Sequence, residues 1–130
     1  MGRRSTVSTL RFLDLSYCIY VTDVGVRAVS TMDALASLDL TSCNLLSNEA
    51  VAAVSGMPAL TYLNLSECSA VTNEAAREAC ATMPALSSLI LVGCRDVTAA
   101  NVQRLRTKYP HIRIVKGWRP PNCRLDDPFF

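Results

Sequence analysis

Leucine and cysteine recur along this chain at nearly constant spacing. The same phrase returns four times, as LRFLDLSYC at 10–18, LASLDLTSC at 35–43, LTYLNLSEC at 60–68 and LSSLILVGC at 86–94. The steps between copies are 25, 25 and 26 residues. A fixed period of this length is the sequence signature of a solenoid, in which each unit packs on its neighbours.

Within each copy the leucines alternate with other residues, which predicts a short strand with one face in the core. Each strand opens on a leucine: Leu10, Leu35, Leu60 or Leu86. The inward leucines that follow are Leu13, Leu15, Leu38, Leu40, Leu63, Leu65, Leu89 and Leu91.

A helix is predicted after each strand. Hydroxyl residues suited to cap a helix N-terminus recur as Thr22, Ser47, Thr72 and Thr98. Apolar residues then follow at helical spacing: Val26, Val29, Val51, Val54, Ala76, Ala79, Val102 and Leu105. A later column, Met32, Met57, Met83 and Tyr109, marks the helix ends, and Pro58, Pro84 and Pro110 follow it where the helix must stop.

The unit is therefore strand, turn, helix and turn. Stacked in register, about four units and a terminal strand form an α/β solenoid with a parallel sheet on the concave side and helices on the convex side. The last strand lies in HIRIV, with either Ile112 and Ile114 or Ile112 and Val115 inward. We expect one repeat domain over residues 1–116 and an irregular tail or cap over 117–130.

The pattern L-x-x-L-x-L-x-x-C-x-x-[VL]-[TS]-[DN] resembles the cysteine-containing leucine-rich repeat of F-box proteins and of scaffolds in cilia, flagella and other assemblies. The resemblance covers about residues 7–116. It implies protein–protein recognition on the repeat surface. No F-box precedes the first repeat, so the chain looks like the C-terminal part of a longer horseshoe or a small stand-alone member.

The first repeat lacks a cap, because only six residues precede Val7. The edge strand around Leu13 would expose backbone groups and apolar side chains, which is an aggregation hazard. We expect the chain to be a C-terminal fragment or to be docked in an assembly that covers this end.

Four of the six cysteines stand in one repeat column: Cys18, Cys43, Cys68 and Cys94. The column predicts buried, reduced thiols that donate weakly to neighbouring carbonyls. Zinc sites need paired cysteines or clustered histidines. The sequence has no C-x-x-C pair and a single histidine, His111, so we expect no metal and no cofactor.

Catalysis is not indicated either. The best carboxylate pair, Asp14 and Asp39, occupies one outward column of adjacent strands, about 5 Å apart. That spacing can raise the pKa of one carboxyl group or hold a cation. Without a histidine or lysine beside the pair, a solvated acidic stripe is the plainer interpretation, and we assign no catalytic residue.

A partner is expected to bind the concave face, which changes character along the stack. Its first strands carry acids and hydroxyls, whereas the fourth carries aliphatic groups. Exposed aromatic and aliphatic residues on a polar sheet are candidate anchors. The expected contacts are Phe12, Asp14, Asp39, Tyr62, Asn64, Ile90 and Val92. Alternatively, the tail covers Ile90 and Val92.

Charge divides the chain. Residues 12–96 hold three basic and nine acidic residues, a net charge of −6, whereas residues 97–124 hold seven basic residues and no acidic one. The basic end could contact an acidic protein surface or, less readily, nucleic acid. Its candidate contact residues are Arg104, Arg106, Lys108, Arg113 and Trp118, and Trp118 could instead cap the last repeat.

The main functional hypothesis is a non-catalytic protein-interaction module that uses the concave face and the basic end. The alternatives are a structural subunit of an axonemal, mitochondrial or ribosomal assembly, and the substrate-recognition part of an F-box-type ubiquitin ligase. No apolar run reaches the roughly 20 residues that a membrane-spanning helix needs. The start MGRRST lacks the apolar core of a secretory signal. We expect an intracellular, cytoplasmic protein, including one in a cytoskeletal or organellar assembly.

Overall fold

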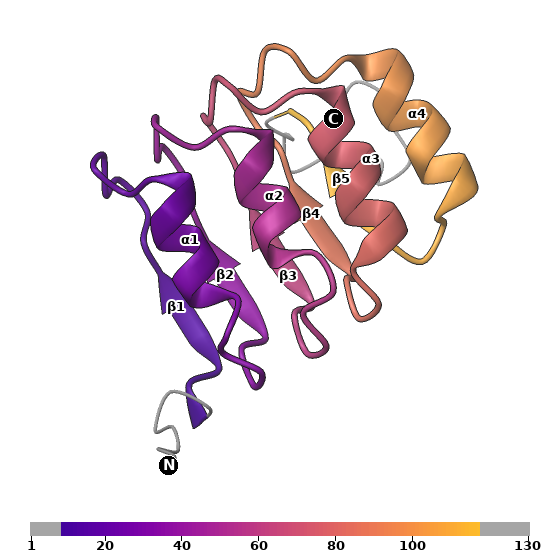
Figure 1. The fold of residues 1–130 in the computed structure, drawn as a ribbon. Helices are drawn as coiled ribbons and strands as arrows, with labels where there is room; N and C mark the ends of the chain where they lie inside the picture. The colour runs from indigo at the N-terminus through magenta and orange to yellow at the C-terminus, as the bar shows by residue number, and fades with distance from the viewer. Residues whose placement is uncertain (1–8, 118–130) are drawn as a thin grey trace.

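The computed structural model describes residues 9–117, in which a strand and a helix alternate four times before a fifth strand (Figure 1). The strands are β1 (Phe12–Asp14), β2 (Ser37–Asp39), β3 (Tyr62–Asn64), β4 (Ser88–Ile90) and β5 (Arg113–Val115). The helices are α1 (Asp23–Val29), α2 (Asn48–Val54), α3 (Asn73–Thr82) and α4 (Ala99–Lys108).

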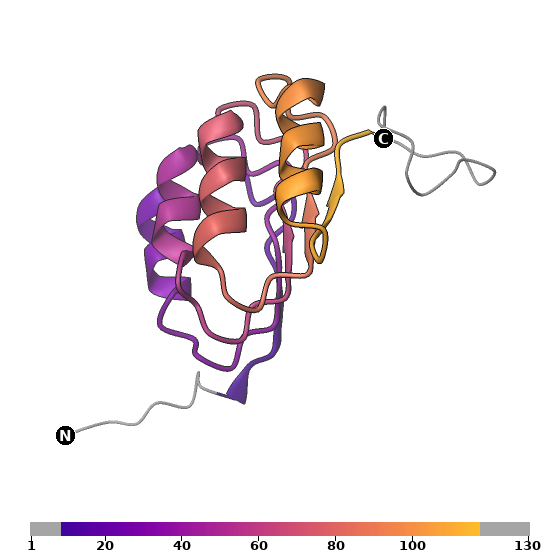
Figure 2. The same ribbon diagram turned by 90° about the vertical axis from the view of Figure 1, so that its right-hand side faces the viewer.

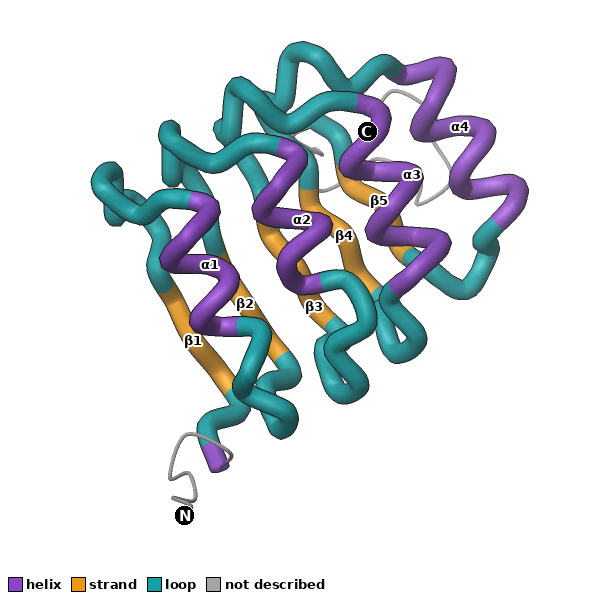
Figure 3. Tube along the Cα trace, in the orientation of Figure 1, coloured by secondary structure: helices purple, strands orange, loops and turns teal. Residues whose placement is uncertain are grey.

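The strands form one parallel sheet in the order β1-β2-β3-β4-β5. Its central register joins one inward residue from each strand: Leu13, Leu38, Leu63, Leu89 and Ile114. The helices cover one face of the sheet, so the predicted concave face is the open face that no described helix covers (Figures 2 and 3). The predicted α/β leucine-rich-repeat solenoid is confirmed.

The core lies between the sheet and the helices, as the repeat columns predict. From Leu35 onward the strand leucines are buried, and so are the helix residues predicted to face inward: Val26, Val29, Val51, Val54, Ala76, Ala79, Val102 and Leu105. Each N-cap hydroxyl accepts a backbone amide of its own helix, as Ser47 Oγ does from Glu49 N at 3.2 Å and Thr98 Oγ1 does from Asn101 N at 3.2 Å. The cap satisfies an amide that has no partner inside the helix.

The 26-residue step from Leu60 to Leu86 is longer than the other two steps because its helix is longer. Helices α1 and α2 have 7 residues, whereas α3 and α4 have 10. Of the two alternatives for the last strand, the one with Ile112 and Ile114 inward is correct. Both residues are buried, whereas Val115 is only half-buried. Ile114 therefore pairs with Leu89.

The cysteine column links each repeat to the one before it. The Sγ atoms of Cys43, Cys68 and Cys94 donate to the carbonyl oxygens of Leu15, Leu40 and Leu65 at 3.1, 3.2 and 3.0 Å. Burial raises the pKa of the Cys68 thiol to about 12, so the group stays protonated at neutral pH.

The first repeat departs from one expectation, because Cys18 is exposed rather than buried. Leu10 keeps 38% of its surface. Within residues 9–117 no repeat lies beyond β1, so Cys18 has no preceding carbonyl column to donate to. The predicted exposure of this edge is confirmed, since Ile19 is also 48% exposed.

Replacing Leu65 with Ala should lower the free energy of unfolding by about 2–5 kcal/mol, because it leaves a cavity between stacked repeats. Leu45, which is 54% exposed, provides the matched control, and Leu45→Ala should cost less than about 1 kcal/mol. Urea unfolding measures both. Equal losses for the two variants would contradict the assigned core.

Thiol reactivity should separate Cys18 from the rest of the column. In a Cys123→Ser background, which removes the tail thiol, an aromatic disulfide reagent should label Cys18 rapidly in the native chain. Cys43, Cys68, Cys80 and Cys94 should react only after denaturant is added, because they are buried. Labelling of Cys68 as fast as Cys18 would contradict the burial of the cysteine column between stacked repeats.

Candidate functional site

Four of the expected contact residues meet in one hollow on the open face. The hollow has a volume of about 240 Å³. The four residues are Phe12, Asp14, Asp39 and Tyr62, and Leu13 and Ser37 complete the lining. The strand register explains the grouping, since Phe12, Ser37 and Tyr62 are Cα partners across β1, β2 and β3. We call this set the acidic hollow.

Two aromatic rings stand at the sides of the acidic hollow. Phe12 is 72% exposed and Tyr62 is half-buried. One strand with a small side chain, Ser37, separates them, which places their Cα atoms about 10 Å apart at two strand spacings. A flat or narrow group can enter between rings held at that distance.

The two carboxylates of the hollow also serve the local structure. Oδ1 of Asp14 accepts the amide of Ser16 at 2.9 Å, and Oδ1 of Asp39 accepts the amide and the hydroxyl of Thr41 at 3.0 and 2.6 Å. The hydrogen bonds from Ser16 lower the pKa of Asp14 below its usual value. The suggestion that the pair raises a carboxyl pKa is thus wrong for Asp14, because the turn supplies donors to the charged form.

Asn64 continues this turn pattern, and Ile90 ends it. Oδ1 of Asn64 accepts the amide of Ser66 at 3.0 Å. Ser66 is buried, and its carbonyl oxygen accepts the amide of Ser42 in the preceding turn at 2.8 Å. Ile90 offers no such oxygen. Three residues after it stands Gly93 at a φ of +78°, where the other repeats place a non-glycine residue with positive φ.

Gly93 meets two requirements. Glycine adopts positive φ without the penalty that a side chain brings, and a Cβ atom at this position would collide with the carboxyl group of Glu67. The fourth repeat thus combines a glycine at the positive-φ position with an aliphatic residue at the Ile90 position. Ile90 lies beside Val115 in the register, and both are half-buried, as is Val92.

A ladder of side-chain hydrogen bonds joins the N-terminal ends of successive helices, and it was not predicted from the sequence. Asp23 accepts the amide and hydroxyl of Ser47 at 3.0 and 2.7 Å. The pairs Asn48–Thr72 and Asn73–Thr98 repeat the contact in the next two repeats. The [TS]-[DN] step of the repeat pattern is its sequence signal.

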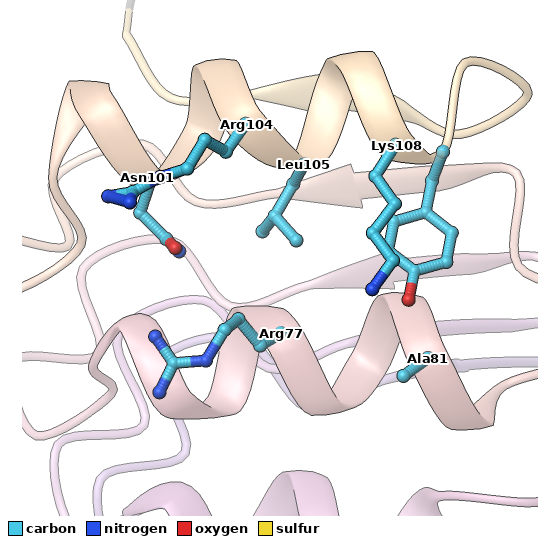
Figure 4. Close-up of a pocket in the computed structure, with 7 residues that line it drawn as sticks. Arg77, Ala81, Asn101, Arg104, Leu105 and Lys108 are labelled. Carbon is cyan, nitrogen blue, oxygen red and sulfur yellow. The ribbon is translucent and has the colours of Figure 1, made fainter.

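The basic residues of the last repeat do not form one patch. Arg104 and Lys108 line a hollow of about 430 Å³ between α3 and α4, together with Arg77 of α3 (Figure 4). Arg106 turns to the backbone instead, and its Nε and Nη2 atoms donate to the Ile114 carbonyl at 3.2 and 2.8 Å. Arg113 is exposed on β5, in register with Ser88, and Trp118 lies outside the described residues.

Among residues 9–117 no group of three or more histidine, cysteine, aspartate or glutamate side chains could hold a metal ion. No helix in that range is long and apolar enough to cross a membrane. The described residues form a repeat stack with one hollow on the open face and another between α3 and α4.

Comparisons with known proteins agree with this geometry. The family model described as Leucine Rich repeat matches residues 8–30, which include most of the first repeat. A comparison with curated protein sequences found no match. The leucine-rich-repeat assignment is therefore confirmed from sequence and fold together.

Several solved structures are similar to this chain, including the following two. A chain of the crystal structure of the Rad7 and Elc1 complex in yeast aligns with a TM-score of 0.68 at 25% identity, over 78% of this chain. This chain spans only 25% of that one. A chain from the structure of the Chaetomium Mex67:Mtr2 subunits aligns with a TM-score of 0.59 at 17% identity, over 85% of this chain and 83% of that one, and shows the fold alone. The repeat match and the first of these neighbours together support a protein-interaction module.

Asp39 offers a test of the turn role. Asp39→Ala should lower the free energy of unfolding by about 1–2 kcal/mol, because the Thr41 amide and hydroxyl lose their acceptor. Asp39→Asn should cost little, since Asn64 already makes the same turn in the next repeat. Chemical denaturation measures both, and equal losses would show that the charge, not the acceptor oxygen, matters.

Proposed function

We propose that this chain is a non-catalytic protein-recognition module that binds a basic segment of a partner protein in the acidic hollow. The observation that carries the proposal is the grouping of two aromatic rings and two adjacent carboxylates on the open face of the sheet. The leucine-rich-repeat fold and the likeness to chains of solved complexes favour the same class of function.

The carboxylates would bind the cationic head of a lysine or arginine side chain. Thr41 occupies only Oδ1 of Asp39, so Oδ2 is available to a donor from a partner. Asp14 stays ionised at neutral pH because its pKa is lowered. Charge-assisted hydrogen bonds to such groups are about twice as strong as neutral ones.

The aromatic rings would hold the same side chain by its flat or apolar part. A cation over the face of an aromatic ring gains about 0.5–1 kcal/mol at an exposed site. The aliphatic residues Ile90, Val92 and Val115 extend the surface along the sheet, where apolar residues of the same segment would pack. The partner that fits is an extended segment with basic residues at one end and apolar residues at the other.

Binding of a labelled peptide that contains lysine, arginine and leucine tests this function by fluorescence anisotropy. Asp14→Asn/Asp39→Asn should weaken binding about tenfold while leaving the melting temperature nearly unchanged, because asparagine keeps both turn acceptors. Phe12→Ala should weaken it about threefold to fivefold.

Tyr20→Ala is the matched control for Phe12→Ala. Tyr20 is 85% exposed but does not line the acidic hollow. Equal affinity of the native chain and the double asparagine variant would rule out the acidic hollow as the binding site. Equal affinity for a peptide with glutamine in place of lysine and arginine would rule out recognition of charge.

A second candidate is a structural subunit of a larger intracellular assembly, such as an axonemal, mitochondrial or ribosomal particle. The exposed apolar side chains of the first repeat favour it, because Ile19, Tyr20 and Val24 keep 48, 85 and 65% of their surface. The mass of the particle that contains this chain, isolated from its native source, distinguishes a stoichiometric subunit from a transient receptor. An F-box-type receptor would instead be found as a longer polypeptide in a ubiquitin-ligase complex.

A further inference from the structure

The hollow between α3 and α4 lies on the helical side of the molecule, away from the acidic hollow. Arg77 and Ala81 face it from α3, and Asn101, Arg104, Leu105 and Lys108 face it from α4 (Figure 4). Tyr109 also lines it. We call this set the basic hollow.

A break in a repeat column explains why the hollow exists here. Three residues after the N-cap, α2 and α3 carry Ala50 and Ala75, which are buried. Helix α4 carries Asn101 at the same position. A small apolar residue lets neighbouring helices approach closely, whereas a larger polar one holds them apart.

Asn101 is buried without a partner for its side-chain amide. The residue keeps 5% of its surface, and its Nδ2 atom donates to no acceptor among residues 9–117. Its backbone amide is already used by the N-cap of Thr98. A buried donor without an acceptor is costly and rare in native proteins, so this one calls for a ligand that supplies an oxygen.

The charged residues around Asn101 indicate which kind of ligand would supply this oxygen. Arg77, Arg104 and Lys108 are exposed, and none of the three forms an ion pair with a described residue. No carboxylate lines the hollow. Lys108 Nζ lies 5.6 Å from the centroid of the Tyr109 ring, which holds its charge at the rim. An anion entering the hollow therefore meets three cations and one neutral donor.

The floor of the basic hollow is apolar, which favours a peptide over a nucleic-acid backbone. Leu105 and Ala81 lie between the polar groups. A phosphate backbone is recognised by cations and hydrogen-bond donors and gains little from an aliphatic floor. An acidic peptide offers carboxylates for the rim and an apolar side chain for the floor.

We propose that the basic hollow binds an acidic, leucine-containing segment of a partner protein. A carboxylate oxygen of that segment accepts the Asn101 Nδ2 hydrogen, neighbouring carboxylates pair with Arg77, Arg104 and Lys108, and an apolar side chain packs on Leu105. This site is separate from the acidic hollow and does not depend on the function proposed for it.

Titration with a synthetic peptide of glutamate and leucine, followed by ¹H–¹⁵N NMR, tests the proposal on the whole chain. The Asn101 side-chain amide signals should shift strongly on binding, because that group gains an acceptor. The side-chain amides of Asn48 and Asn73 already donate to Thr72 and Thr98, so they should stay in place as internal controls. Saturation without a shift of the Asn101 signals, or no saturation at millimolar peptide, would overturn the proposal.

Variants separate this site from general charge attraction. Arg77→Ala should weaken peptide binding about threefold to fivefold, and Arg104→Ala/Lys108→Ala about tenfold. Arg27 occupies on α1 the position that Arg77 occupies on α3, so Arg27→Ala is the matched control and should leave the affinity unchanged. Equal losses from Arg27→Ala and Arg77→Ala would refute the site.

Two further measurements keep the alternatives apart. Asn101→Ala restores the residue type of Ala50 and Ala75, so it should keep or raise the melting temperature and still weaken peptide binding. Unchanged affinity in that variant would show that Asn101 does not bind the peptide and would overturn its role in the site. Tighter binding of single-stranded DNA than of the peptide, with the same losses in the arginine and lysine variants, would assign the hollow to nucleic acid instead. Asp14→Asn/Asp39→Asn should not affect this peptide, which distinguishes failure here from failure at the acidic hollow.

Discussion

Stacking in register is the constraint on which the rest of this structure depends. A single repeat cannot bury its leucines or satisfy its turns, so each one uses its neighbour. The thiol of Cys68 donates to the carbonyl of Leu40, and the amide of Thr72 donates to Asn48. Sheet hydrogen bonds, thiols and the helix-end ladder all join the same two repeats, so a shift of one residue would break all three sets of contacts.

Both candidate sites lie on or beside the regular columns of this stack. In the acidic hollow the regular strand spacing brings side chains from three repeats together. Its carboxylates also accept the backbone amides of the turns that follow β1 and β2. The basic hollow arises where a column breaks, at Asn101. In the fourth repeat Ile90 stands where the other repeats place an aspartate or asparagine, which adds an aliphatic residue to the open face. Surfaces of opposite charge thus occupy the two sides of one scaffold.

The sequence alone predicts the fold well because every repeat column reports the same environment several times. Strand leucines, N-cap hydroxyls and the open-face order could all be read in this way. Column reasoning fails at positions that lack a neighbour, as for Cys18, whose exposure depends on what lies beyond β1. The lowered pKa of Asp14 was also not predicted, because it depends on the hydrogen bonds that Ser16 donates in the turn. The basic hollow could not be predicted, since it depends on the spacing between two helices.

Amide hydrogen exchange, measured strand by strand, tests the central claim most directly. The amide of Leu65 donates to Ile90 and that of Leu15 donates to Asp39, each at 2.8 Å. Their hydrogen bonds are equal in length, but repeats flank Leu65 on both sides and Leu15 lies on the edge strand. If stacking provides the stability, the Leu65 amide should exchange at least about tenfold more slowly than that of Leu15. Equal protection, or slower exchange at Leu15, would contradict the account.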